Sequence, residues 1–166
     1  MSQVVRPVEP ADVVTVVAMV HELAAYERAP ELCQLTVEQL TAALFGPAPV
    51  LFGHVATDGD GRPLGFALWF VSFSTWHGVH GIYLEDLYVR PDARGAGAGR
   101  ALLAELARIC VERGYRRLEW WVLDWNESAL QFYRRAGAEP MDEWTVWRLS
   151  GDALTSLAGA PVGESP

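Results

Sequence analysis

The chain has 166 residues, of which 51% are hydrophobic, and a formal net charge of -8 at pH 7. This length is typical of one domain with a sizeable core. Its 21 acidic residues outnumber its 13 basic ones, which argues against a nucleic-acid surface and favours a cationic ligand.

Cysteine usage and hydropathy limit the class of protein further. Only Cys33 and Cys110 are present, and the four histidines show no ligand-pair spacing, so we expect neither a disulfide framework nor a bound metal. No apolar run reaches the roughly 20 residues of a membrane span, and the first residues lack the pattern of a signal peptide. The expected location is therefore cytoplasmic, with no membrane or nucleic-acid partner.

The N-terminal half predicts a strand, two helices and a hairpin. A short strand at residues 3–7 precedes a helix over Asp12–Tyr26, where apolar residues recur at helical spacing. A second, shorter helix is expected from Thr36 to the sequence FGPAP. Residues 50–57 and 63–73 read as two strands, and the intervening DGDGR supplies the glycines of a hairpin turn.

The C-terminal half predicts alternating strands and helices. Residues 81–89 (GIYLEDLYV) are apolar on both faces apart from two acids, which is typical of a strand in mid-sheet. A helix with one apolar face follows over Gly99–Arg113, and Gly114 is placed to cap it. The remaining elements are a strand at 116–125, a helix at 126–137, a last strand at 143–150, and a short, partly disordered tail at 151–166. The order is that of a mixed α/β (α+β) protein forming a single domain over residues 1–150.

The glycine-rich stretch RPDARGAGAGR, residues 90–100, lies between the mid-sheet strand and a helix. Gly95, Gly97 and Gly99 leave consecutive N–H groups unblocked at the positive end of a helix dipole, an arrangement that suits a pyrophosphate. No Lys-Ser or Lys-Thr follows, which excludes a nucleotide-hydrolysing P-loop. The dinucleotide fingerprint is excluded as well, because the next acid at the required distance, Glu119, follows a helix in mid-chain. The alternative is a flexible loop without a ligand.

Two motifs carry a family resemblance. The segment YLEDLYVRPDARGAGAGRALLAEL resembles the acetyl-CoA motif of the GNAT N-acetyltransferases, with Arg94, Gly97 and Gly99 matching Arg/Gln-x-x-Gly-x-Gly/Ala. Downstream, WNESALQFYRRAGAE resembles the second motif of that superfamily. Within it the chain is most similar to the spermidine/spermine and thialysine acetyltransferases, over residues 4–149.

The resemblance implies a GNAT fold, with a central mixed, mostly antiparallel, splayed sheet flanked by about four helices. It also implies acetyl-CoA as co-substrate, with no metal. Backbone groups of Leu87 and Val89 would pair with the pantetheine arm, and N–H groups of residues 95–100 would hold the pyrophosphate. The full set of expected cofactor-binding residues is Leu87, Tyr88, Val89, Arg94, Gly95, Ala96, Gly97, Ala98, Gly99, Arg100, Asn126 and Tyr133.

Acetyl transfer to an amine requires a proton acceptor for the ammonium and a proton donor for the departing thiolate. Glu85 and Asp86 would point to opposite faces of a regular strand, and a carboxylate on its apolar face should have a raised pKa. The resemblance implies that Glu85 is the general base, through a water, that Asp86 helps to bind the cation, and that Tyr133 protonates the sulfur. The alternative role for Tyr133 is packing of its helix, together with Phe132.

The acceptor is expected to be a small cation. By resemblance, the residues that would line the amine channel are Tyr26, Glu27, Trp76, Asp86 and Trp147. Ser74 and Thr145 stand where polyamine enzymes carry acids, so we expect a lysine-like compound or small diamine with one primary amine to react, in preference to spermine.

The sequence leaves three classes of function open. The leading hypothesis is a small-molecule amine N-acetyltransferase, which by resemblance would be a homodimer. The alternatives are a protein acetyltransferase acting on lysine or an N-terminus, and a non-catalytic acyl-CoA-binding module.

Overall fold

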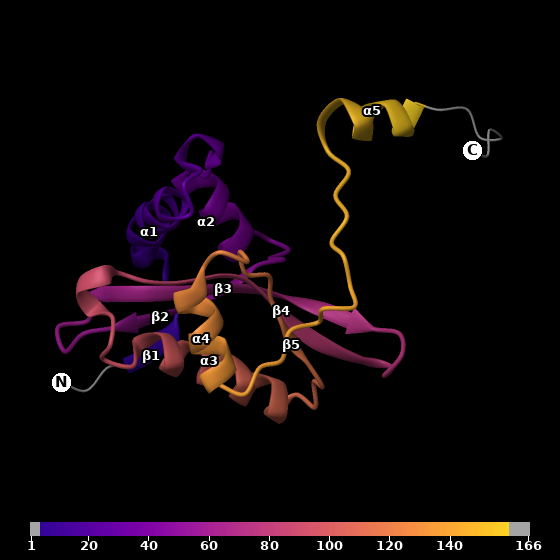
Figure 1. Ribbon diagram of the computed structural model, residues 1–166. Coiled ribbons are helices and arrows are strands. Elements are labelled where there is room, and N and C mark those ends of the chain that lie inside the picture. Colours follow the sequence, from indigo (N-terminus) through magenta and orange to yellow (C-terminus); the bar gives the residue numbers. More distant parts are fainter. Residues whose placement is uncertain (1–3, 160–166) are drawn as a thin grey trace. The chain divides into compact units, whose positions relative to one another are not determined.

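The computed structural model describes residues 4–159, which fall into two compact units, one ending at Leu123 and one beginning at Asp124. The first unit contains a five-stranded sheet and three α-helices, and the second contains the helices α4 and α5 (Figure 1). The boundary lies inside the range expected for one domain, so the single domain over residues 1–150 stays a prediction.

The sheet of the first unit has the strand order β1-β2-β3-β4-β5, in which only the β4–β5 pair is parallel. The mixed, mostly antiparallel sheet is therefore confirmed. In chain order, the elements of this unit are β1 Val4–Pro7, η1 Pro10–Asp12, α1 Val13–Tyr26, η2 Pro30–Leu32, α2 Val37–Phe45, β2 Phe52–Thr57, β3 Pro63–Ser74, β4 Val79–Val89, η3 Pro91–Ala93, α3 Ala98–Glu112 and β5 Leu118–Glu119.

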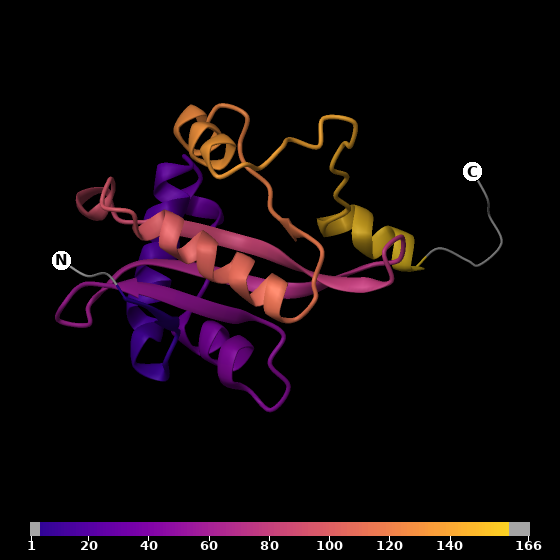
Figure 2. The same cartoon turned by 90° about the horizontal axis from the view of Figure 1, so that it is seen from below.

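Helices cover both faces of this sheet. Helices α1 and α2 lie on one face and α3 lies on the other, as Figures 1 and 2 show. The core of the α1–α2 face includes Val16 and Met19 from α1, packed with Phe66, Leu68 and Tyr88 from β3 and β4. These helices form where the sequence predicts them because their apolar residues repeat at helical spacing, and the Thr36 side chain caps the start of α2.

A bulge interrupts β4 at Glu85. Asp86 pairs with Leu68 of β3, whereas Leu84 pairs with Trp69, so Glu85 is an extra residue in the ladder. Leu68 belongs to the core under α1 and α2, while Trp69 hydrogen-bonds to His54 on the α3 side. Side chains that are paired across strands share a face, so Leu84 faces α3 and Asp86 faces α1. The expected alternation of a regular strand therefore fails at the two acids.

Two predicted strands differ from the structure. The strand expected over residues 116–125 is limited to β5, because only Ile82 and Tyr83 of β4 pair with it. The strand expected at residues 143–150 is absent: these residues form neither helix nor strand, and the described part of the second unit contains no strand for them to pair with.

The second unit contains α4 Glu127–Arg135 and α5 Gly151–Gly159. Helix α4 begins as predicted, because the Asn126 side chain accepts a hydrogen bond from the N–H of Ala129, and Gly137 follows its end with a φ of 88°. Residues 151–159, which we expected in a tail, form a fifth α-helix. The rest of that tail, residues 160–166, lies outside the described residues.

Candidate active site

Three carboxylates gather where β4 meets the end of α1. Asp86 is half-buried on the α1 face, and Glu85 and Glu27 are the two acids whose charges act on it. Burial, followed by repulsion from Glu85 and then Glu27, raises the pKa of Asp86 from its usual 3.8 to about 6. Desolvation also raises the pKa of Glu27. Among the described residues, no nearby Arg or His offsets the raised pKa of Asp86 or of Glu27, so the cluster is suited to a cation from outside the chain.

The raised carboxylate pKa that the sequence predicts on this strand belongs to Asp86. Glu85, which the family resemblance implies as the general base, is the bulged residue and is exposed. Our prediction that the two acids lie on opposite faces assumed regular pairing, which the bulge removes. The only sequence feature that hints at this bulge is the pair of consecutive acids in an otherwise apolar strand.

The edge of β4 that faces away from β3 is open next to these acids. In the described part of the chain, β5 pairs only with Ile82 and Tyr83, so no strand covers this edge from Leu84 to Val89. The N–H of Arg90 donates to Leu64 of β3, and alternation along the strand turns the backbone groups of Val89 and Leu87 the other way. Both residues therefore have the orientation that strand-like pairing with an extended ligand requires.

The glycine loop leads from this open edge into α3. Gly95 and Gly97 have φ values of 80° and 94°, in the left-handed region that favours glycine, and Gly97 is the N-cap of α3. The space around both α-carbons on the side-chain side is open to at least 4 Å. The first N–H groups of α3, from Ala98 to Arg100, have no partner four residues earlier within the helix. This geometry fits an anion such as a pyrophosphate.

The Arg94 side chain turns back onto the protein. Its Nε donates to the Val89 carbonyl at 2.9 Å, and its guanidinium lies 5.1 Å from the centre of the Tyr26 ring and 5.6 Å from that of Tyr88. Arg94 thus contacts α1 and β4, a role that sequence reasoning missed, because no local pattern predicts a contact with a residue 68 positions earlier.

The other expected site residues are spread over the chain. Trp76 lies at the tip of the β3–β4 hairpin and is 85% exposed. The eight residues of β4 from Val79 to Asp86 span about 23 Å at the usual rise per residue, so within one chain Trp76 and the carboxylates of β4 are far apart. Tyr133, Asn126 and Trp147 belong to the second unit, where Tyr133 lies on α4 with its ring centre 5.1 Å from that of Phe132, and Trp147 is 90% exposed.

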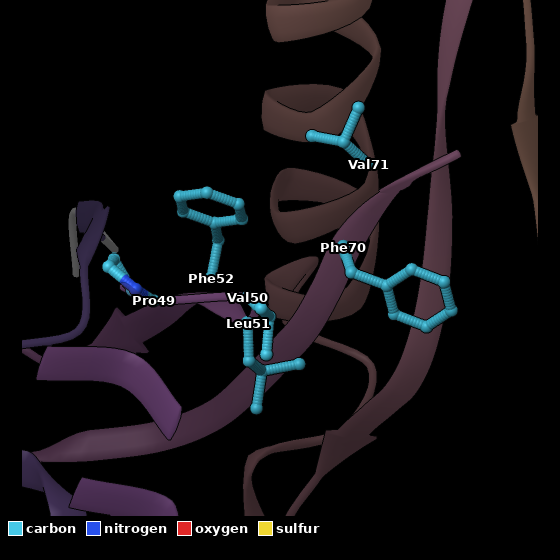
Figure 3. Close-up of a pocket in the computed structure, with 6 residues that line it drawn as sticks. All are labelled: Pro49, Val50, Leu51, Phe52, Phe70 and Val71. Carbon is cyan, nitrogen blue, oxygen red and sulfur yellow. The ribbon is translucent and has the colours of Figure 1, made fainter. Parts of the chain in front are cut away.

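An apolar hollow of about 590 Å³ lies at the start of β2, beside the middle of β3 (Figure 3). It is lined by Pro49, Val50, Leu51, Phe52, Phe70 and Val71. Figure 3 shows the Phe70 ring turned away from Phe52. None of the lining residues is ionisable, so this hollow has no group that could take up or donate a proton.

The fold and the site define an acyl-transfer protein of the GNAT class, and comparison with known proteins agrees. The profile of the Acetyltransferase (GNAT) family matches residues 17–138, and the chain belongs to this family. It is 34% identical to a thialysine N-epsilon-acetyltransferase from Bos taurus, over 93% of this chain and 96% of that protein. It is 28% identical to an L-ornithine N5-acetyltransferase from Arabidopsis thaliana, over 92% and 86% of the two chains.

Solved structures show the same fold. An integron cassette protein from the mobile metagenome of V. cholerae superposes with a TM-score of 0.80 at 27% identity, covering 96% of this chain and 99% of that one. The expected GNAT fold and the N-acetyltransferase class are thereby confirmed. Among the helices of residues 4–159, none has the length and apolar character needed to cross a membrane.

Proposed function

We propose that the chain transfers an acetyl group from acetyl-CoA directly to the primary amine of a small cationic acceptor. The observation that carries this proposal is the carboxylate cluster of Asp86, Glu85 and Glu27, in which burial and the two neighbouring acids raise the pKa of Asp86, and which adjoins the open edge of β4. An alkyl ammonium supplies the positive charge that these acids attract. The named activities of the thialysine and ornithine relatives support the same class of acceptor.

The residues of the chain account for the steps of such a transfer. The cluster binds the ammonium, and one of its carboxylates removes a proton, so that the amine nitrogen can attack the thioester carbon. The carbon–sulfur bond then breaks, and we propose that the Tyr133 hydroxyl protonates the thiolate. Backbone groups of Leu87 and Val89 and the N–H groups of residues 95–100 would orient the acyl donor.

Both β4 acids are candidates for the base that removes the proton in the first step. Asp86, with its pKa of about 6, is a competent proton acceptor near neutral pH, because a base works best when its pKa is close to the ambient pH. Glu85 remains the base that the family resemblance implies, acting through a water. Glu85→Gln and Asp86→Asn distinguish the two: the base is the residue whose replacement abolishes the acidic limb of the pH–rate curve.

The acceptor preference can be tested directly. Thiol release from acetyl-CoA is measured with lysine, thialysine, ornithine, putrescine, spermidine, spermine and a lysine-containing peptide. We expect turnover with the lysine-like compounds or the small diamine and weaker turnover with spermine, because Ser74 and Thr145 replace acids. Turnover with the peptide alone would favour the protein-acetyltransferase alternative, and tight acetyl-CoA binding with no turnover would favour the binding module.

Direct transfer has a test that suits this sequence. All 13 basic residues are arginines, so the chain contains no lysine that could be acetylated adventitiously. Intact-mass measurement after mixing with acetyl-CoA, without an amine, should show no added acetyl group. A stable mass increase that disappears on adding the amine would indicate a covalent acetyl-enzyme and refute direct transfer.

The assembly proposed for this activity is a homodimer in the cytoplasm, with no nucleic-acid or membrane partner. Sedimentation at micromolar concentration checks the dimer, and a monomer there would contradict it.

A further inference from the structure

The last turn of α1 is attached to the glycine loop through one arginine. Arg94 immediately precedes Gly95, and its guanidinium lies within cation–π range of two rings, those of Tyr26 and Tyr88. Its Nε also donates to the Val89 carbonyl at 2.9 Å. The arginine therefore contacts α1, the end of β4 and the open strand edge at the same time.

A second set of contacts lies one helical turn earlier. Glu22 of α1 accepts from Arg90 through Nε at 3.3 Å and a terminal nitrogen at 3.1 Å, and burial, followed by the nearby Glu22, raises the pKa of Tyr88. The Tyr88 ring, one of the two beside Arg94, is buried. Because residues four apart lie on the same helix face, Glu22 and Tyr26 hold two successive turns of α1 against the end of β4.

The same turn of α1 carries one of the acids of the cluster. Glu27 follows Tyr26 directly, and the chain then turns tightly: the N–H of Ala29 donates to Ala24 at 3.0 Å, and Arg28 has a φ of 65°. A non-glycine residue in this left-handed region persists only where its surroundings fix it. A shift of Tyr26 is therefore passed to the backbone of Glu27, whose charge acts on Asp86.

We propose that Tyr26 is a positioning residue that acts through Arg94, so that acyl-CoA bound at the glycine loop and a cationic amine bound at Glu27 and Asp86 strengthen each other's binding. This inference rests on the proposed function, and it gives Tyr26 a role other than the direct substrate contact that the family resemblance implies. A ligand held by the N–H groups of residues 95–100 restrains the backbone next to Arg94. The arginine then restrains Tyr26, and with it the acid that follows.

The coupling is measurable with coenzyme A, which cannot donate an acetyl group. Its dissociation constant is determined by titration calorimetry, with and without the amine of the acceptor panel that gives the highest turnover. We expect the amine to tighten coenzyme A binding about five-fold in the unaltered protein, the lower end of usual coupling between sites. Tyr26→Phe keeps the ring and should retain the effect, whereas Tyr26→Leu should bring the ratio close to one.

A matched control and a double variant test whether Arg94 carries the effect. Tyr115 also lies beside an arginine, 6.0 Å from Arg113, but away from the glycine loop, so Tyr115→Leu should leave the five-fold ratio unchanged. Arg94→Leu should abolish the coupling, and adding Tyr26→Leu to it should change nothing further. Coupling that survives Tyr26→Leu, or that Tyr115→Leu also removes, would overturn the proposal.

An amine-independent measurement separates this inference from the proposed function. Coenzyme A alone should slow amide hydrogen exchange at residues 26–29 in the unaltered protein and in Tyr26→Phe, but not in Tyr26→Leu. If coenzyme A binds and exchange at these amides does not change, the positioning role is wrong while the proposed function stands. If coenzyme A fails to bind the unaltered protein, both are wrong.

Discussion

Replacement of Asp86 by asparagine should make the protein more stable and less active. Burial beside two other acids raises the pKa of Asp86 from 3.8 to about 6, and this difference corresponds to about 3 kcal/mol of destabilisation once the group is ionised in both states. Asparagine removes the charge but leaves a half-buried amide that needs partners, at a cost of about 1–2 kcal/mol. The expected net gain for Asp86→Asn is therefore about 1–2 kcal/mol at pH 8.

The stability gained by Asp86→Asn should depend on pH. Because the pKa of Asp86 is higher in the folded state, the folded protein binds more protons between about pH 4 and pH 6, and its stability falls as the pH rises through that window. The gain from Asp86→Asn should therefore be absent at pH 4 and complete above pH 6. Urea unfolding at pH 4 and pH 8 measures it, and thermal unfolding should show a rise of about 2–4 °C per kcal/mol at this chain length.

Asp12 provides the matched control. It is buried too, but hydrogen bonds from Arg6 and from the Glu9 N–H outweigh the effect of burial and lower its pKa. Asp12→Asn should therefore destabilise the protein at pH 8, the opposite sign to Asp86→Asn. Our account of the cluster is refuted if Asp86→Asn gives no gain at pH 8, or the same gain at both pH values. Turnover of Asp86→Asn with the best amine should fall, because Asp86 helps to bind the ammonium, and a fall of about 100-fold or more would indicate that Asp86 is also the base.

Three further predictions concern other parts of the chain. Burial lowers the pKa of His54 despite the nearby Glu105, so the folded protein should lose stability as the pH drops below about 6.5, where His54 becomes protonated in the unfolded chain. His54→Gln should make this loss smaller. The comparison is made by thermal unfolding in an Asp86→Asn background, which removes the opposite pH dependence of Asp86. Gly97→Ala forces a side chain into a left-handed φ of 94°, so it should destabilise the protein by about 1–2 kcal/mol and weaken coenzyme A binding, as measured by calorimetry. Gly59 lies in open space without such a φ, so Gly59→Ala should change neither stability nor binding. Tyr133→Phe should reduce turnover by about 10² to 10⁴, and unchanged turnover would mean that another group protonates the sulfur.

Local sequence determined much of the architecture. Helices α1, α2, α3 and α4 and the β2–β3 hairpin lie where their periodicity, caps and turn residues predict, because each signal depends on residues within a few positions of one another. The glycine loop was predictable for the same reason. A positive φ before a helix N-terminus is a backbone requirement, and glycine meets it at Gly95 and Gly97.

The tertiary structure decided which acid is buried, because the bulge that puts Asp86 on the α1 face is a property of the pairing between β3 and β4. It also decided where Arg94 lies, since its contact with Tyr26 joins segments far apart in the sequence. Residues 143–150 show that a local pattern alone does not make a strand. Their alternating pattern is typical of a strand, but a strand forms only where another strand can supply its hydrogen bonds. Contacts between distant segments have no local sequence signal, and at this site those contacts set the pKa of the acid.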